Sequence, residues 1–82
     1  MYTVYVLRSI KTNRYYIGVT KDLINRLERH NSGSVRSTKA YRKWKVIYTE
    51  EYSNKKDAWR RELEVKKYKS GLKFNKLIGG VA

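Results

Sequence analysis

The stretch that decides the fold is Tyr-Thr-Val-Tyr-Val-Leu at 2–7, followed after a short polar connection by Tyr-Tyr-Ile-Gly-Val at 15–19. Both runs consist of β-branched, aromatic and other apolar residues, which favour strands. The connection over residues 9–14 is polar and contains an asparagine, a typical turn residue. Two strands joined this closely predict an antiparallel hairpin, with Tyr5 and Tyr16 on neighbouring strands.

A helix is predicted to follow the second strand. Asp22 can cap its amino end, and Leu23, Ile24 and Leu27 form an apolar stripe at helical spacing. The Asn-Ser-Gly sequence that follows is a typical helix end. The polar, basic residues 33–43 then predict a loop.

The second half of the chain predicts a third strand and further helical structure. Residues 44–52 alternate and are rich in strand-forming types, whereas residues 55–70 predict a second helix that ends at Gly71. Residues 73–78 could form a short last helix. The apolar positions of the second helix are Ala58, Trp59, Leu63, Val65 and Tyr68. We therefore expect an α/β (α+β) fold: a small three-stranded antiparallel sheet flanked by helices, in the order β-β-α-β-α-(α).

The chain is small and strongly basic. A domain of 82 residues buries only about 60–65% of its unfolded surface, so we expect one domain over residues 1–82. Twenty Lys and Arg against seven Asp and Glu give a formal net charge of +13, which attracts polyanions. Nucleic acid is the leading partner, with an acidic membrane surface or ribosomal RNA as alternatives.

The positive charge lies within folded-looking sequence instead of a tail, which predicts a charged face on a domain. One cluster surrounds the start of the third strand, and the other extends over residues 55–76. From these clusters we predict nucleic-acid contacts by Arg36, Lys39, Arg42, Lys43, Lys45, Arg61 and Lys66.

The composition also indicates the cellular compartment in which the protein is expected. The chain has no cysteine, so it has no disulfide and no thiolate zinc site. No apolar run approaches the roughly 20 residues of a membrane span, and no basic region precedes an apolar stretch at the amino end. We therefore expect a soluble, cytoplasmic protein with no membrane partner.

Two of the eight tyrosines are candidates for chemistry. Most tyrosines fill strand positions, and core packing is the alternative for Tyr5 and Tyr16 too. These two differ because the hairpin brings them together near Arg26. A phenol with a pKa of about 10 is a poor base at neutral pH, but a neighbouring cationic field lowers that pKa.

Arg26 and His30 lie four residues apart and share one face of the first predicted helix. Arg26 is either a solvated surface charge or a bidentate contact to a phosphate whose developing charge it stabilises. His30 is the only histidine, so it cannot build a histidine-rich metal site. A general acid/base or phosphate-orienting role fits it better.

Glu62 interrupts the apolar stripe of the second predicted helix. It lies four residues after Ala58 and three before Val65, where a core residue would be expected. A half-buried carboxylate needs a partner, either an arginine or Mg²⁺. The acidic residues predicted to be surface charges without a chemical role are Glu28, Glu50, Glu51 and Glu64.

Together, Thr3-Val4-Tyr5, Tyr16-Ile17-Gly18, Arg26-x-x-x-His30 and Glu62 resemble the motifs of the GIY-YIG nuclease superfamily, in particular its small stand-alone bacterial members. The resemblance extends from residue 2 to about residue 70. The first motif reads Thr-Val-Tyr instead of Gly-Ile-Tyr, which keeps the tyrosine.

The resemblance implies hydrolysis of a phosphodiester with one Mg²⁺ or Mn²⁺ ion. In that scheme Tyr5 looks like the general base or water-orienting phenol, and Tyr16 is similar to the second motif tyrosine, which supports nucleophile and phosphate. Arg26 matches the arginine that stabilises the transition state and His30 the assisting base or proton relay. Glu62 matches the single metal-binding carboxylate.

The expected function is thus a metal-dependent endonuclease, with DNA favoured over RNA. Homing and repair relatives usually add targeting domains, so we expect low sequence specificity unless a protein partner supplies it. The alternative is a non-catalytic nucleic-acid-binding module that retains the nuclease fold and binds through Lys and Arg contacts to phosphate.

Overall fold

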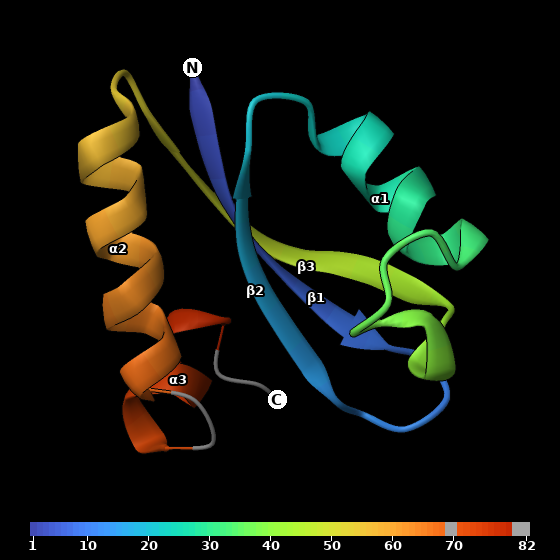
Figure 1. The fold of residues 1–82 in the computed structure, drawn as a ribbon. Helices are drawn as coiled ribbons and strands as arrows, with labels where there is room; N and C mark the ends of the chain where they lie inside the picture. The colour runs from blue at the N-terminus through green and yellow to red at the C-terminus, as the bar shows by residue number, and fades with distance from the viewer. Residues whose placement is uncertain (69–70, 80–82) are drawn as a thin grey trace.

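The computed structural model describes residues 1–68 and 71–79 (Figure 1). The strands are β1 (Tyr2–Ser9), β2 (Tyr15–Thr20) and β3 (Trp44–Tyr52). The helices are α1 (Leu23–Ser32), the 3₁₀ helix η1 (Lys39–Tyr41), α2 (Lys55–Tyr68) and α3 (Leu72–Leu77). The order β-β-α-β-α-α agrees with the prediction. No helix in the described ranges is long and apolar enough to cross a membrane.

The three strands form an antiparallel sheet in the order β2-β1-β3, with β1 in the centre. Figure 1 shows α2 and α3 on one side of the sheet and α1 on the other. Because side chains alternate along a strand, β1 contributes Val6 to one face and Tyr5 and Leu7 to the other. The first face packs on Val65 and Phe74, so the core consists of two layers separated by the sheet.

The predicted hairpin is confirmed. Tyr5 pairs with Gly18 and Leu7 pairs with Tyr16, so the two motif tyrosines lie on neighbouring strands. The turn residue Asn13 has a φ of 61°, a left-handed conformation that asparagine tolerates. Its side-chain oxygen accepts a hydrogen bond from the Arg8 guanidinium at 2.6 Å, which holds the turn.

The ends of α1 agree with the prediction, but its apolar stripe is narrower. The Asp22 carboxylate accepts from the backbone N–H of Asn25, and Gly33 closes the helix at a φ of 87°. Leu23 and Leu27 pack against the Tyr5 face of the sheet. Ile24 is 79% exposed, so its assignment to the stripe was wrong. One residue is a rotation of about 100° on a helix, which turns residue 24 towards solvent.

In helix α2, too, two residues that were assigned to the apolar stripe face solvent. Ala58 and Val65 are fully buried, whereas Trp59 and Leu63 are 56% and 42% exposed. The inward face therefore consists of positions 58, 62 and 65, and Glu62 does interrupt it. The predicted end at residue 70 lies outside the described residues, and α3 begins one residue earlier than predicted.

The segment 33–43 is more ordered than the predicted loop, because it contains η1 and is tied to β3. Thr38 is buried, and its carbonyl accepts from the Trp44 indole at 3.0 Å. The Asn31 side chain makes two further bonds to the backbone of Trp44, at 2.6 and 3.1 Å. Polar residues here satisfy backbone groups, which the sequence pattern does not reveal.

Two glutamates predicted to be plain surface charges belong to an ion-pair network between β3 and α2. Glu50 is only 18% exposed and accepts from Arg61 at 2.8 and 3.0 Å, and from Tyr52 at 2.6 Å. Arg61 also reaches Glu64 at 2.8 Å. Burial alone would raise the pKa of Glu50, but the bonds from Arg61, Tyr48 and Tyr52 outweigh it and lower that pKa to about 2.

We expect Glu50→Gln to lower the free energy of unfolding by about 1.5–3 kcal/mol, the usual contribution of hydrogen bonds to a charged group. The amide keeps the shape of the carboxylate but has only one acceptor oxygen, so one of the two bonds from Arg61 is lost and the other loses its charge assistance. Urea unfolding measures the loss, with Glu51→Gln as the matched control because Glu51 is the exposed neighbour on the same strand. Equal losses in both variants would mean that the network stabilises nothing.

Candidate active site

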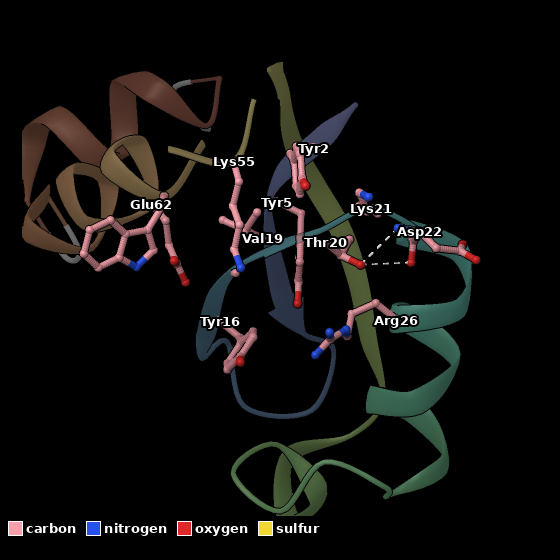
Figure 2. Close-up of a pocket in the computed structure, with 12 residues that line it drawn as sticks. Tyr2, Tyr5, Tyr16, Val19, Thr20, Lys21, Asp22, Arg26, Lys55 and Glu62 are labelled. Atoms are coloured by element: carbon pink, nitrogen blue, oxygen red, sulfur yellow. Dashed lines mark hydrogen bonds between the residues drawn. The ribbon is translucent and has the colours of Figure 1, made fainter. Parts of the chain in front are cut away.

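A cavity of about 530 Å³ lies along β2, the edge strand, where α1 and α2 both reach it (Figure 2). Four of the five predicted catalytic and metal-binding residues line it, namely Tyr5, Tyr16, Arg26 and Glu62. They come from β1, β2, α1 and α2 respectively. The fifth, His30, is fully buried and contacts Tyr5. The fold thus brings all five together from four elements.

Gly18 lets the Tyr5 phenol reach this cavity from the central strand. The phenol has to pass the backbone of β2, and it does so beside Gly18, its partner in the sheet register. A Cβ atom at position 18 would lie 2.6 Å from the Tyr5 hydroxyl oxygen, far inside van der Waals contact. Figure 2 shows the resulting hydroxyl facing the same space as the Arg26 guanidinium. The glycine of the second motif is therefore a packing requirement for the tyrosine of the first.

A buried chain of hydrogen bonds connects Tyr5, His30 and Thr38. The Thr38 hydroxyl donates to the carbonyl of Val35 at 3.3 Å, so it accepts from His30 Nδ1–H at 2.8 Å. His30 Nε2 is then the acceptor for the Tyr5 hydroxyl, 3.2 Å away. Both His30 and Thr38 are almost fully buried. From this pattern of bonds we assign to His30 the tautomer protonated at Nδ1.

The pKa of Tyr5 is shifted in the direction opposite to the one expected from the positive net charge. Burial raises the pKa of Tyr5 well above its ordinary value; the Tyr16 phenol and the Glu62 carboxylate raise it further, and Arg26 only partly opposes them. The expectation of a phenol acidified by the cationic field was therefore wrong, because desolvation of a 1% exposed side chain outweighs one nearby guanidinium. Tyr5 is protonated at neutral pH.

His30 is neutral in the same range. Burial lowers its pKa below 6.5, and the positive charges of Arg26 and Arg29 lower it further. A neutral imidazole with Nδ1 protonated has a free Nε2 lone pair, which faces the Tyr5 hydroxyl. In this tautomer the Tyr5 hydroxyl donates a hydrogen bond to the imidazole.

This burial predicts a stability change on acidification. Because the folded pKa of His30 is below 6.5, the unfolded chain takes up a proton first as pH falls, so the free energy of unfolding decreases below pH 6.5. Urea unfolding at pH 7.5, 6.5 and 5.5 measures this, and His30→Gln should flatten the dependence. The contribution of Glu50 is lost only below pH 4.5, outside this window. The same slope in both proteins would contradict the assignment.

Arg26 reaches the cavity from the first turn of α1. The Thr20 side chain bonds to the backbone of Asp22 at 3.1 and 3.3 Å, which ties the end of β2 to the start of this helix. Arg26 is half-buried, and no carboxylate in residues 1–68 and 71–79 lies within ion-pair distance of it. Its charge is available to an anion in the cavity, unlike that of Arg61.

Glu62 lies in the cavity wall contributed by α2. Its side chain is 15% exposed, and its one ion-pair partner within the described ranges is Lys66, at 3.1 Å along the same helix. The described part of the chain holds no group of three or more His, Cys, Asp or Glu side chains that could enclose a metal. Mg²⁺ commonly takes only one or two carboxylates and completes its shell with water and phosphate oxygens, so this single carboxylate fits it.

The predicted nucleic-acid contacts lie outside this cavity. Arg36, Lys39, Arg42, Lys43 and Lys45 belong to the η1 segment and the start of β3, whereas Arg61 and Lys66 are in ion pairs.

Sequence reasoning did not single out Lys55, which does line the cavity. It lies seven residues before Glu62, two helical turns away on the same face, so the helical spacing from Glu62 could have indicated it. Thr38 gives no such signal, because it belongs to an irregular segment.

Comparison with known proteins identifies the family of the chain. Residues 1–75 match the family model described as the GIY-YIG catalytic domain. A UPF0213 protein of Pediococcus pentosaceus is 44% identical over 78 residues, covering 92% of this chain and 81% of that protein. A UPF0213 protein of Staphylococcus aureus is 41% identical over 54 residues, covering 65% and 66% of the two chains. The solution NMR structure of a Bacillus halodurans UPF0213 protein covers both chains fully at 26% identity and a TM-score of 0.48. The chain therefore belongs to the GIY-YIG catalytic domain family, a family of nucleases.

Proposed function

We propose that this protein is a divalent-metal-dependent endonuclease that hydrolyses phosphodiester bonds, with DNA as the favoured substrate and low intrinsic sequence specificity. The observation that carries the proposal is the cavity in which a phenol bonded to a neutral imidazole shares one space with a free guanidinium and a carboxylate. Family membership supports the reaction class, and the net charge of +13 supports a polyanionic substrate.

Tyr5 and His30 activate the attacking water in this proposal. A water molecule beside the Tyr5 hydroxyl loses its proton to the phenol oxygen while the phenol proton moves to His30 Nε2. The raised pKa of Tyr5 is then no obstacle, because no free phenolate forms. The imidazolium that results keeps its Nδ1–H bond to Thr38.

The other three residues act on the phosphate. Arg26 donates to a non-bridging oxygen and stabilises the added negative charge of the transition state. Tyr16, 6.3 Å from Tyr5 between ring centres, orients nucleophile and phosphate. Glu62 would hold the metal ion, which when bound polarises the phosphate and stabilises the leaving oxygen. A metal ion on Glu62 would compete with the Lys66 ammonium group, which lies 3.1 Å from the same carboxylate.

The basic residues outside the cavity are proposed to hold the rest of the strand. Arg36, Lys39, Arg42, Lys43 and Lys45 carry no described ion pair, whereas contacts by Arg61 and Lys66 would compete with their glutamate partners. Phosphate contacts of this kind confer affinity but no sequence preference. We propose that a protein partner supplies any targeting in the cytoplasm.

The test is cleavage of end-labelled single-stranded, duplex and branched DNA and of matched RNA, each with Mg²⁺, with Mn²⁺ and with EDTA. We expect metal-dependent products from the wild type and a loss of about 10²–10⁴-fold for Tyr5→Phe, which removes the proton-transferring hydroxyl. Equal cleavage by Tyr5→Phe would point to a contaminating nuclease. Salt-dependent binding without any metal-dependent product would make the chain a non-catalytic binding module.

Gly18→Ala should cost about a hundredfold in cleavage rate, because the new methyl group would displace the Tyr5 hydroxyl and a shift of about 1 Å has effects of that size. The rate is measured under single-turnover conditions alongside thermal unfolding. In a Tyr5→Phe background the same substitution should add little, because the hydroxyl that it displaces is already absent. A full hundredfold loss in both backgrounds would contradict this explanation.

A further inference from the structure

A second cavity of about 460 Å³ adjoins the first and shares Tyr16 with it. It lies between the β1–β2 turn and the segment that contains η1. Its volume is within the range of about 300–1,000 Å³ that is usual for small-ligand sites. Apart from Tyr16 and Thr38, the proposed hydrolysis does not use its wall, which includes Arg14, Tyr41 and Trp44.

The Arg14 side chain is held in place at this cavity and has no described acidic partner. Its guanidinium carbon lies 4.3 Å from the centre of the Tyr41 ring, a cation–π contact. No carboxylate in residues 1–68 and 71–79 is within ion-pair distance of it. A guanidinium stacked on a ring keeps the N–H groups in its plane free to donate to a phosphate.

The half-buried rings of Tyr16 and Tyr41 give the cavity an aromatic wall that suits a nucleobase, and Trp44, 4% exposed, packs against Tyr16. Tyr16 and Trp44 lie edge to face with ring centres 6.4 Å apart, and Tyr41 is held by a bond from the Ser9 hydroxyl to its carbonyl at 2.7 Å. Base–aromatic stacking is a common source of affinity for nucleic-acid strands and tolerates any base. Asn13 adds an amide to the wall, and its oxygen is already bonded to Arg8.

We propose that this cavity is a subsite for the nucleotide next to the scissile phosphate, with its base against the aromatic wall and its phosphate on Arg14. The proposal rests on the proposed nuclease function, because a polymeric substrate held at Arg26 and Glu62 must continue past the cut. Tyr16 forms a wall of both cavities, so a strand that crosses this ring leaves the first cavity and enters the second.

The two tryptophans of the chain make the test direct, because Trp44 lines the second cavity and Trp59 the first. Trp59 is 56% exposed, so Trp59→Phe should fold and leave Trp44 as the only tryptophan. This protein is titrated with a five-nucleotide thymidine strand in EDTA while Trp44 emission is followed. We expect a saturable change in emission, and about tenfold weaker binding after Arg14→Gln, the effect of one lost bond to a charged group.

Lys11→Gln is the matched control, because Lys11 is exposed in the same turn and its loss removes the same charge. We expect it to weaken binding less than twofold. Equal weakening by Arg14→Gln and Lys11→Gln would mean that only the net positive charge affects binding, and this would overturn the subsite. Binding without a change in Trp44 emission, or no binding, would also overturn it.

The titration tests the subsite independently of the nuclease proposal, because it measures binding without metal and does not depend on cleavage. Metal-dependent cleavage by a protein whose Trp44 does not respond would refute the subsite alone. A Trp44 response that Arg14→Gln weakens, in a protein that never cleaves, would refute the nuclease proposal and leave the second cavity as a nucleotide-binding site.

Discussion

Glu62→Gln is expected to reduce metal-dependent cleavage about a thousandfold, equivalent to roughly 4 kcal/mol of transition-state stabilisation. The amide keeps the size of the carboxylate but loses its charge, and the described part of the chain holds no group of three or more His, Cys, Asp or Glu side chains that could hold the metal instead. Single-turnover cleavage at increasing Mg²⁺ or Mn²⁺ measures the effect. Part of the activity should return at high metal concentration, because substrate phosphate and water supply the other ligands.

Glu64→Gln is the control for this variant. Glu64 lies on the same helix two residues further on, 52% exposed and paired with Arg61 instead of facing the cavity. We expect it to cleave at the wild-type rate within about twofold, since exposed ion pairs contribute little. If both glutamine variants cleave alike, the carboxylate at position 62 has no special role and the metal contact must lie elsewhere.

Arg26→Ala is expected to lower the single-turnover rate by about 10²–10³-fold with a smaller change in substrate affinity. The guanidinium faces the cavity without a described carboxylate partner, so its charge is available where the phosphate gains negative charge. Binding in EDTA, measured separately, distinguishes a rate effect from a binding effect. Arg26→Lys should recover only part of the rate, because an ammonium group cannot donate two parallel bonds to a phosphate.

Arg29→Ala tests whether any arginine of α1 would give this loss. Arg29 lies one turn further along the helix, is exposed and does not line the cavity. It does help to keep the pKa of His30 low, so its removal should move the pH profile of cleavage slightly while leaving the maximal rate nearly unchanged. A rate loss as large as that of Arg26→Ala would mean that the arginines act through general charge.

The predictions that succeeded concern local patterns. The strand-forming residues of 2–7 and 15–19 and their short connection predicted the hairpin, which places Tyr5 and Tyr16 on neighbouring strands. The spacing of Glu62 from Ala58 and Val65 placed a carboxylate on the inward face of α2. The same reasoning failed for Ile24 and Trp59, because an apolar residue beside a stripe need not belong to it.

The order of the elements, the neighbouring strands of the two motif tyrosines and the inward position of Glu62 can all be read from the sequence. Strand-forming residue types and helical periodicity act over a few residues, so the chain displays them directly. The protonated state of Tyr5, the bond from His30 to Thr38 and the half-buried pair of Glu50 and Arg61 emerge only from the folded structure. Each of these depends on desolvation and on contacts between residues far apart in the chain, which no local pattern encodes.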